Sequence, residues 1–244
     1  MQNLVKHQIN CNHQDHTYKE YWSAKISKDH PLLLNSIKLC EDEYKNYNPH
    51  DPSGRKRTEQ KRKGMCIYGK LAEHALRSIL NAEIENSGVQ ASIPESKNGF
   101  DDLDKEDQID ITIIVNGEPF TIEVRSSFPY ARIEEVITKH FSILGWYTTT
   151  NKPYEKPKDF YLRVLFPFPE RECMDYLRKG FDLFFVGGAT KELLDSKLGG
   201  WQDESMKQYG GRYRTIKPIC KGYDARQILD KMFPNAKPED FAGT

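Results

Sequence analysis

The chain has 244 residues and a mass of 28.4 kDa, enough for one domain with a sizeable core, or for one domain with appendages. Hydrophobic residues make up 37% and charged residues 30%, and the 11% aromatic content argues against wholesale disorder. Basic and acidic residues each number 36, so the net charge is zero and any nucleic-acid binding must come from local patches.

The sequence predicts a cytoplasmic protein that does not enter a membrane. Its longest apolar runs are a handful of residues, too short for a membrane span, and its N-terminus lacks the apolar core of a signal peptide. The five cysteines are odd in number, scattered, and form no CxxC pair. We therefore expect reduced thiols and no disulfide framework.

Residues 1–54 are expected to form an N-terminal extension, helical or irregular, in front of the core. An apolar cluster at Pro31–Leu39 predicts a short helix, and a loop rich in Asn, Pro and Asp ends at Gly54. No second Cys/His pair follows at a familiar spacing. A zinc module is still an alternative for this segment, with three candidate ligands: Cys11, His13 and His16.

A basic run precedes the first long helical pattern. Six of the nine residues in Arg55–Lys63 are basic. From Tyr68 to Leu80, apolar residues recur at spacings of three and four, which predicts an amphipathic helix. Glu73 lies at the border of its apolar stripe, where an acid is either simply solvated or part of a site.

The strongest local signal is a β-hairpin. Ile109–Val115 is rich in β-branched residues, and Phe120–Arg125 alternates between apolar and polar side chains. Asn116-Gly117 between them is typical of a two-residue turn, because both turn positions require positive φ. With this turn, one face is wholly apolar and is predicted to be core; it consists of Ile109, Ile111, Ile113, Phe120, Ile122 and Val124.

The same register places Asp110 directly opposite Glu123, with Arg125 on the same side of the hairpin. The Cβ atoms of the two acids are then roughly 5 Å apart, and facing like charges destabilise a hairpin unless a cation lies between them. Arg125 could neutralise them as a purely structural arrangement. A divalent cation is the other solution, since hard cations bind carboxylate oxygens.

These residues resemble the motif of the PD-(D/E)xK nuclease superfamily. The resemblance lies in Glu73 of the first helix, Asp110 in Gln108-Ile109-Asp110, and Glu123-Val124-Arg125 on the partner strand. The expected order of elements over about residues 60–190 is also similar to the αβββαβ core of that family.

The resemblance implies an α/β protein with a restriction endonuclease-like core over residues 55–200, in which helices flank a mixed central sheet. It also implies hydrolysis of nucleic-acid phosphodiesters with Mg²⁺ or Mn²⁺ held by Asp110 and Glu123. Glu73 would complete the acidic cluster directly or through water. The metal would orient and deprotonate the attacking water and offset charge in the transition state.

Arg125 occupies the position where this family usually has lysine. Arginine keeps its proton at any relevant pH and cannot act as a general base, but its fork of donors can hold the scissile phosphate. Water activation would fall to the metal or to a nearby group such as Lys70 or Lys139. Alternatively, Arg125 neutralises the acids in an inactive site.

Beyond the hairpin, a helical pattern covers Arg132–Trp146, and apolar runs predict buried strands at Phe160–Phe166 and Phe181–Val186. A further helix is expected near Lys191–Leu198. Residues 201–244 are expected to pack on the core as a C-terminal segment.

Basic residues alternate with tyrosines between Lys207 and Arg226, which suits phosphate contacts with base or sugar stacking; an ordinary solvated surface is the alternative. A last helix is expected to begin after Asp224. The residues predicted to contact nucleic acid are basic or aromatic and come from several segments: Arg55, Lys56, Arg57, Lys61, Arg62, Lys63, Lys70, Arg132, Lys139, Arg212, Tyr213 and Arg214.

The sequence thus favours a metal-dependent DNA endonuclease, of restriction type or acting in repair or recombination, without a small-molecule cofactor. A homodimer is expected, because one site cuts one strand and duplex cleavage at a symmetric sequence suits two-fold symmetry. The alternative is a nucleic-acid-binding or complex-assembly subunit that keeps this fold without chemistry. In that case Arg125 should be salt-bridged to the two acids.

Overall fold

The computed structural model describes residues 4–12, 17–46, 49, 56–94, 109–129, 131–148, 155–203 and 212–234. The strands in these ranges are β1 (Val5–Asn12), β2 (Thr17–Ile26), β3 (Ala91–Ser92), β4 (Ile111–Val115), β5 (Glu118–Ser127), β6 (Ile143–Thr148), β7 (Phe160–Leu165), β8 (Phe181–Thr190), β9 (Gly200–Asp203) and β10 (Arg212–Ile216). The α-helices are α1 (Pro31–Glu43), α2 (Glu59–Ser87), α3 (Ile133–Glu135), α4 (Cys173–Lys179), α5 (Lys191–Asp195) and α6 (Ala225–Met232). The short helical turns are η1 (Tyr44–Asn46), η2 (Val136–His140), η3 (Glu170–Glu172) and η4 (Ile219–Lys221).

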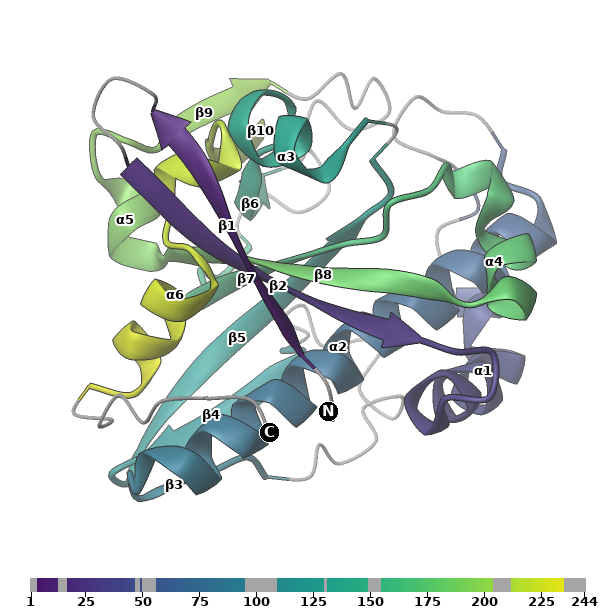
Figure 1. Cartoon of the computed structure of the whole chain (residues 1–244), viewed down its shortest axis with the longest axis horizontal. Coiled ribbons are helices and arrows are strands. Elements are labelled where there is room, and N and C mark those ends of the chain that lie inside the picture. Colours follow the sequence, from purple (N-terminus) through teal and green to yellow (C-terminus); the bar gives the residue numbers. More distant parts are fainter. Residues whose placement is uncertain are drawn as a thin grey trace.

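The predicted α/β class with a mixed sheet and helices is confirmed. The main sheet has seven strands in the order β1-β2-β8-β7-β5-β4-β3, and only the β5–β7 pair within it is parallel. A second sheet has three strands in the order β6-β10-β9. In Figure 1 these three strands gather near α3 and α5, at the other end of the molecule from α1 and α4.

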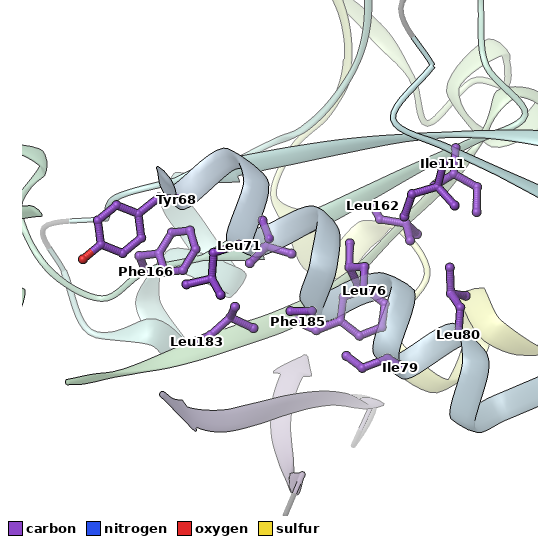
Figure 2. Packing of buried hydrophobic residues seen from close by; sticks show 14 of the residues in the cluster. Tyr68, Leu71, Leu76, Ile79, Leu80, Ile111, Leu162, Phe166, Leu183 and Phe185 are labelled. Atoms are coloured by element: carbon purple, nitrogen blue, oxygen red, sulfur yellow. The ribbon is translucent and has the colours of Figure 1, made fainter. Parts of the chain in front are cut away.

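Helix α2 is the principal helix on one face of the main sheet. Its N-terminus is capped by Thr58, whose side chain accepts a hydrogen bond from the Lys61 amide, and it ends at Gly88 with a φ of 65°. Leu71 and Leu76 point from this helix onto Phe185 of β8 and its neighbours (Figure 2). The helix predicted from the stripe between Tyr68 and Leu80 is confirmed, and it is longer than the stripe.

The opposite face of the main sheet carries a second core. Strand side chains alternate, so Leu162 and Val164 of β7 face α2, whereas Tyr161 and Leu165 pack with Val136 and other apolar residues of η2, β6 and η4. Arg163 lies on this second face by the same alternation. The face therefore combines an apolar layer with charged side chains.

The expectation of a helical or irregular N-terminal extension is wrong for Val5–Asn12 and Thr17–Ile26. These segments are the antiparallel strands β1 and β2, and they join the main sheet because β2 pairs antiparallel with β8, with Trp22 opposite Phe185. Trp22 and Ile26 are buried there. The short helix expected at Pro31–Leu39 is confirmed as α1.

The helix expected over Arg132–Trp146 is also partly wrong. Helical structure stops at His140, and Ile143–Thr148 forms β6, which pairs with β10. Ile143 and Trp146 are buried in the second core, so tertiary pairing overrides the helical spacing. The helix expected near Lys191–Leu198 is present as the shorter α5.

The strand expected at Phe181–Val186 continues through Gly187 to Thr190. Gly187 has a φ of 94°, and Gly188 exchanges backbone hydrogen bonds of 2.9 Å with Tyr223, just before α6. The two glycines thus allow the backbone before α6 to pair with the end of β8.

The expectation of five reduced thiols is wrong for two of them. Cys40 of α1 and Cys66 of α2 form a disulfide, while Cys11, Cys173 and Cys220 are free. The two half-cystines are far apart in sequence, and no spacing motif marks them. Within the described ranges, no helix has both the length and the apolar composition needed to cross a membrane.

Candidate active site

The predicted hairpin register is confirmed in β4 and β5. Asn116 and Gly117 have φ angles of 52° and 86°, and Ile111 lies opposite Ile122. The apolar face is buried at Ile111, Ile113 and Ile122. Ile109 is an exception: strand pairing begins only at Ile111, and Ile109 is 43% exposed, so the prediction that it belongs to the core is wrong.

Asp110 stands directly before β4 and is tied to β5. Its Oδ2 accepts a hydrogen bond of 2.7 Å from the Val124 amide. Its carbonyl oxygen accepts one of 3.0 Å from Nη2 of Arg77, which lies on α2. These bonds hold Asp110 at the place where β4, β5 and α2 meet.

Glu123 and Asp110 are carboxyl groups in an environment that disfavours their charge. Glu123 is 9% exposed, and burial raises its pKa to about 8, with Asp110 and Glu155 adding to the rise and Arg125 opposing it. Burial also raises the pKa of Asp110 to about 6, against the opposing hydrogen bond from Val124. Burial thus favours the protonated form of both carboxyl groups, and more strongly that of Glu123.

Arg125 bridges two carboxylates. Its Nη2 lies 3.2 Å from Oε1 of Glu123 and 3.5 Å from Oε1 of Glu155. Its Cζ lies 5.8 Å from the ring centre of Tyr147 on β6, and Oε2 of Glu155 accepts a hydrogen bond of 2.8 Å from the Tyr147 amide. Burial opposes the charge of Arg125, but these carboxylates raise its pKa above the ordinary value.

Glu73 approaches Asp110 from α2. Its carboxylate is paired within its own helix, at 3.2 Å from Nε of Arg77 and 3.5 Å from Nζ of Lys70. It is close enough to Asp110 to raise the pKa of that group. Glu73 therefore lies near the Asp110 end of the site, with Arg77 connecting the two.

The donor set suits a hard divalent cation. Asp110 and Glu123 offer carboxylate oxygens, and a bound cation would remove the repulsion and burial cost that now raise their pKa values. They do not, however, form a compact triad with Glu73. In the described part of the chain, a triad with ligand atoms within 4.8 Å of one another occurs at Cys40, Glu43 and Cys66, whose sulfurs are joined as a disulfide.

Among the predicted nucleic-acid contacts, Tyr213 is linked to the Glu123 side of the site through Tyr147 and Arg125. Tyr213 on β10 packs against Tyr147 with ring centres 5.4 Å apart, and it adds to the rise in the pKa of Arg125. Tyr147 in turn lies against Arg125. The two tyrosines and the arginine thus form one continuous group beside Glu123.

Several of the predicted basic contacts have partners within the protein. Lys61 pairs with Glu170 at 3.3 Å, Lys70 with Glu73, and Nε of Arg214 donates a hydrogen bond of 2.6 Å to the Leu194 carbonyl. These and other predicted contacts are partly buried: Arg57, Lys61, Arg62, Lys63, Lys70, Tyr213 and Arg214. The exposed ones are Lys56, Arg132, Lys139 and Arg212, and Arg55 lies outside the described residues.

The zinc alternative is untested at two of its three positions. His13 and His16 lie outside the described residues. The thiol of Cys11 hydrogen-bonds to that of Cys220, a bond that raises the pKa of Cys11 and lowers that of Cys220 to about 7. Cys11 therefore has a thiol partner that the sequence pattern did not indicate.

Arg163 on β7 lies in register with Arg125 and so borders the site. Four residues at or beside the site were not among the predicted ones: Arg77, Tyr147, Glu155 and Arg163. Arg77 is one of many charged residues along α2, and Glu155 sits in a polar stretch, so neither carries a local signal. Arg163 does carry one, because it is the single charged residue in the apolar run Phe160–Phe166. A charge in a buried strand is rare enough to single it out.

An uncharacterized protein of Methanocaldococcus jannaschii is similar to this chain. The two are 28% identical over 256 aligned positions, which cover 88% of this chain and 92% of the relative. No family model and no solved structure matches the chain.

Proposed function

We propose that the chain is a divalent-metal-dependent endonuclease that hydrolyses phosphodiester bonds of DNA at Asp110 and Glu123. The observation that carries this proposal is the burial of two neighbouring carboxyls on one hairpin, with pKa values of about 6 and 8 and an arginine beside them. Strongly perturbed acids beside a cationic group are typical of catalytic centres.

The order of elements supports a restriction endonuclease-like core. Helix α2, strands β3, β4 and β5, the helical segment α3–η2 and strand β7 follow one another as in the αβββαβ arrangement, with β6 inserted before β7. Asp110 directly precedes β4 and Glu123 lies within β5, an arrangement that supports the proposed core.

In this proposal Asp110 and Glu123 would hold Mg²⁺ or Mn²⁺, and Glu73, which is paired with Lys70 and Arg77, would complete the acidic cluster through water. The metal would supply an activated water and would offset charge in the transition state. Arg125 stays protonated and holds the scissile phosphate through its donors. Arg77 positions Asp110 through the carbonyl bond, and Tyr213 with Tyr147 offers a stacking surface for a base or sugar.

A second candidate function is a nucleic-acid-binding or assembly role without catalysis. The 3.2 Å ion pair between Arg125 and Glu123 favours it, since an arginine can take the place of a metal between acids. Asp110 has no such pair with Arg125 among the described residues, so its charge is not neutralised in the same way.

We further propose that the active form is a homodimer. A single set of Asp110 and Glu123 cuts one strand, and two copies related by a two-fold axis would cut both strands of a symmetric site. Light scattering over a range of concentrations should give twice the chain mass of 28.4 kDa without DNA, and that mass plus the mass of one duplex when DNA is bound. A monomeric mass in both conditions contradicts this part of the proposal.

Plasmid cleavage tests the proposed function. With Mg²⁺ or Mn²⁺, the wild type should nick or linearise supercoiled plasmid, and Glu123→Gln and Asp110→Asn should lower the rate on the order of a hundredfold or more. Glu118→Gln is the matched control, because Glu118 is exposed at the turn of the same hairpin.

Two outcomes contradict catalysis at this site. One is cleavage that survives unchanged in Glu123→Gln and Asp110→Asn. The other is a wild type that retains DNA in a gel shift but does not cut it with either metal, which would favour the binding role.

A further inference from the structure

Arg163 is a buried cation with few partners. It lies in the middle of β7 and is 3% exposed. Its Nη2 donates a hydrogen bond of 2.8 Å to Oγ of Ser127, but its Nε and Nη1 are buried without a hydrogen-bond partner. In the described part of the chain, no carboxylate pairs with it. The donors of a buried guanidinium are normally all hydrogen-bonded, because burying a donor without a hydrogen bond is energetically costly.

A second arginine lies directly beside it. Strands β5 and β7 run parallel, with Arg125 in register with Arg163, and Nε of Arg125 is also buried without a partner. Burial, and to a lesser extent Arg125, lower the pKa of Arg163 to about 10, so it remains charged at neutral pH. Two charged guanidinium groups therefore share this face of the sheet.

The nearby acids do not balance this pair. Glu123 and Glu155 are both within ion-pair distance of Arg125, not of Arg163. A charge that stays buried without a partner destabilises the fold, so its presence points to a role other than stability. Unfilled donors on two adjacent guanidinium groups are complementary to an oxyanion, since the planar fork of arginine matches phosphate oxygens.

We propose that Arg163, together with Arg125, binds a phosphate group of the substrate beside Asp110 and Glu123. This inference rests on the proposed phosphodiester substrate and adds to it an anion-binding residue from β7. Phe141 lies over Arg163, with its ring centre 6.0 Å from Cζ, and is partly exposed. Binding requires this ring to move aside so that the oxyanion reaches the free donors.

Inorganic phosphate in the presence of EDTA is the direct probe, because no metal and no cleavage are involved. Phosphate should raise the melting temperature of the wild type relative to the same ionic strength of sodium chloride. In Arg163→Met the phosphate affinity should fall about tenfold, since hydrogen bonds to charged groups are lost. Arg178→Met, at an exposed position of α4, is the matched control.

The same variant separates a binding role from a structural one. Methionine fills a similar space without charge, so Arg163→Met should melt at a higher temperature than the wild type when phosphate is absent. A variant that melts lower while phosphate affinity is unchanged overturns the proposal. If Arg163→Met does not fold, Arg163→Lys keeps the charge but loses the fork, and unchanged phosphate affinity in that variant overturns the proposal equally.

Failure of this inference and failure of the proposed function give different results. Arg163-dependent phosphate binding without plasmid cleavage by the wild type supports the anion site and contradicts the nuclease. Metal-dependent cleavage with phosphate affinity equal in the wild type and Arg163→Met supports the nuclease and overturns the anion site.

Discussion

Glu123 is subject to opposing effects within a few ångströms. Its burial and the neighbouring acids favour the protonated form, while Arg125 at 3.2 Å favours the charged form. The balance raises its pKa from 4.5 to about 8. A group whose pKa is higher in the folded state contributes stability below the unfolded pKa and loses it as the pH rises through the folded pKa.

The first prediction follows from the upward direction of the pKa shift of Glu123. In EDTA, the free energy of unfolding of the wild type should fall from about pH 5 to about pH 8, because Glu123 is ionised in the unfolded state over this range while burial keeps it protonated in the folded state. Glu123→Gln lacks this loss and should exceed the wild type at pH 9 by on the order of 5 kcal/mol, since the pKa shifts from 4.5 to about 8 and one pKa unit corresponds to about 1.36 kcal/mol. Urea denaturation at pH 5 and pH 9 measures the difference.

Glu118→Gln serves as the control for that prediction, because Glu118 is exposed on the same strand. Its stability should follow the wild type at both pH values. If Glu123→Gln is less stable than the wild type at pH 9, the ion pair with Arg125 outweighs burial, and the site is better described as a structural salt bridge.

Among the elements, those marked by a local sequence signal could be predicted, and those that depend on pairing with a distant strand could not. Asn116-Gly117 determines the hairpin register from neighbouring residues alone, so β4 and β5 were predictable in detail. The segment Val5–Asn12 is polar and pairs only at the sheet edge, and β2 depends on β8, far along the chain. Nothing local identifies such a partner, so the N-terminal hairpin was missed.

The prediction of a helix over Arg132–Trp146 is partly wrong for a related reason. Its apolar residues keep a helical spacing past His140, yet Ile143–Thr148 pairs with β10 from the C-terminal part of the chain. Over so few residues, the spacing of apolar side chains is compatible both with a short strand and with the end of a helix. Only the partner strand decides between them.

The second prediction concerns Gly187 within β8, where the backbone just before α6 passes close to the strand. Gly187 has a φ of 94°, and a Cβ there would collide with the carbonyl oxygen of Tyr223. Gly187→Ala should therefore destabilise the protein by about 3 kcal/mol or more. Gly88→Ala, where φ is 65° and a Cβ meets nothing within 4 Å, should cost only about 1 kcal/mol. Urea unfolding of both variants measures these costs, and equal effects would contradict the close approach.

The third prediction concerns the link between α1 and α2. The Cys40–Cys66 disulfide closes a loop with a sequence separation of 26, for which chain entropy gives a stabilisation of about 3 kcal/mol. Reduction should lower the free energy of unfolding by about that amount in the wild type and not in Cys40→Ala. Alkylation of unfolded, unreduced protein should modify three cysteines. Five alkylated cysteines would show that the two thiols remain reduced.

At the scale of the whole molecule, the candidate site is assembled from distant parts of the chain. Asp110 and Glu123 could be paired from the sequence because one hairpin carries both. Tyr147 lies on β6 of the second sheet, and Glu155 is held by the Tyr147 amide, so both depend on how the second sheet lies on the first. Arg163 lies on β7 of the main sheet, and its place beside Arg125 depends on the pairing of β5 with β7. This dependence on packing is why the sequence predicted the acids and missed their partners.

The fourth prediction is the central one: Asp110 and Glu123 hold a divalent metal. Isothermal titration of Mg²⁺ and Mn²⁺ at pH 7, in two buffers of different ionisation enthalpy, measures both binding and proton release. With a pKa of about 8, Glu123 is mostly protonated at this pH, so metal binding should release about one proton and the heat should depend on the buffer. Glu123→Gln should show no binding. Absence of binding in the wild type, or equal binding in the variant, would contradict the metal site.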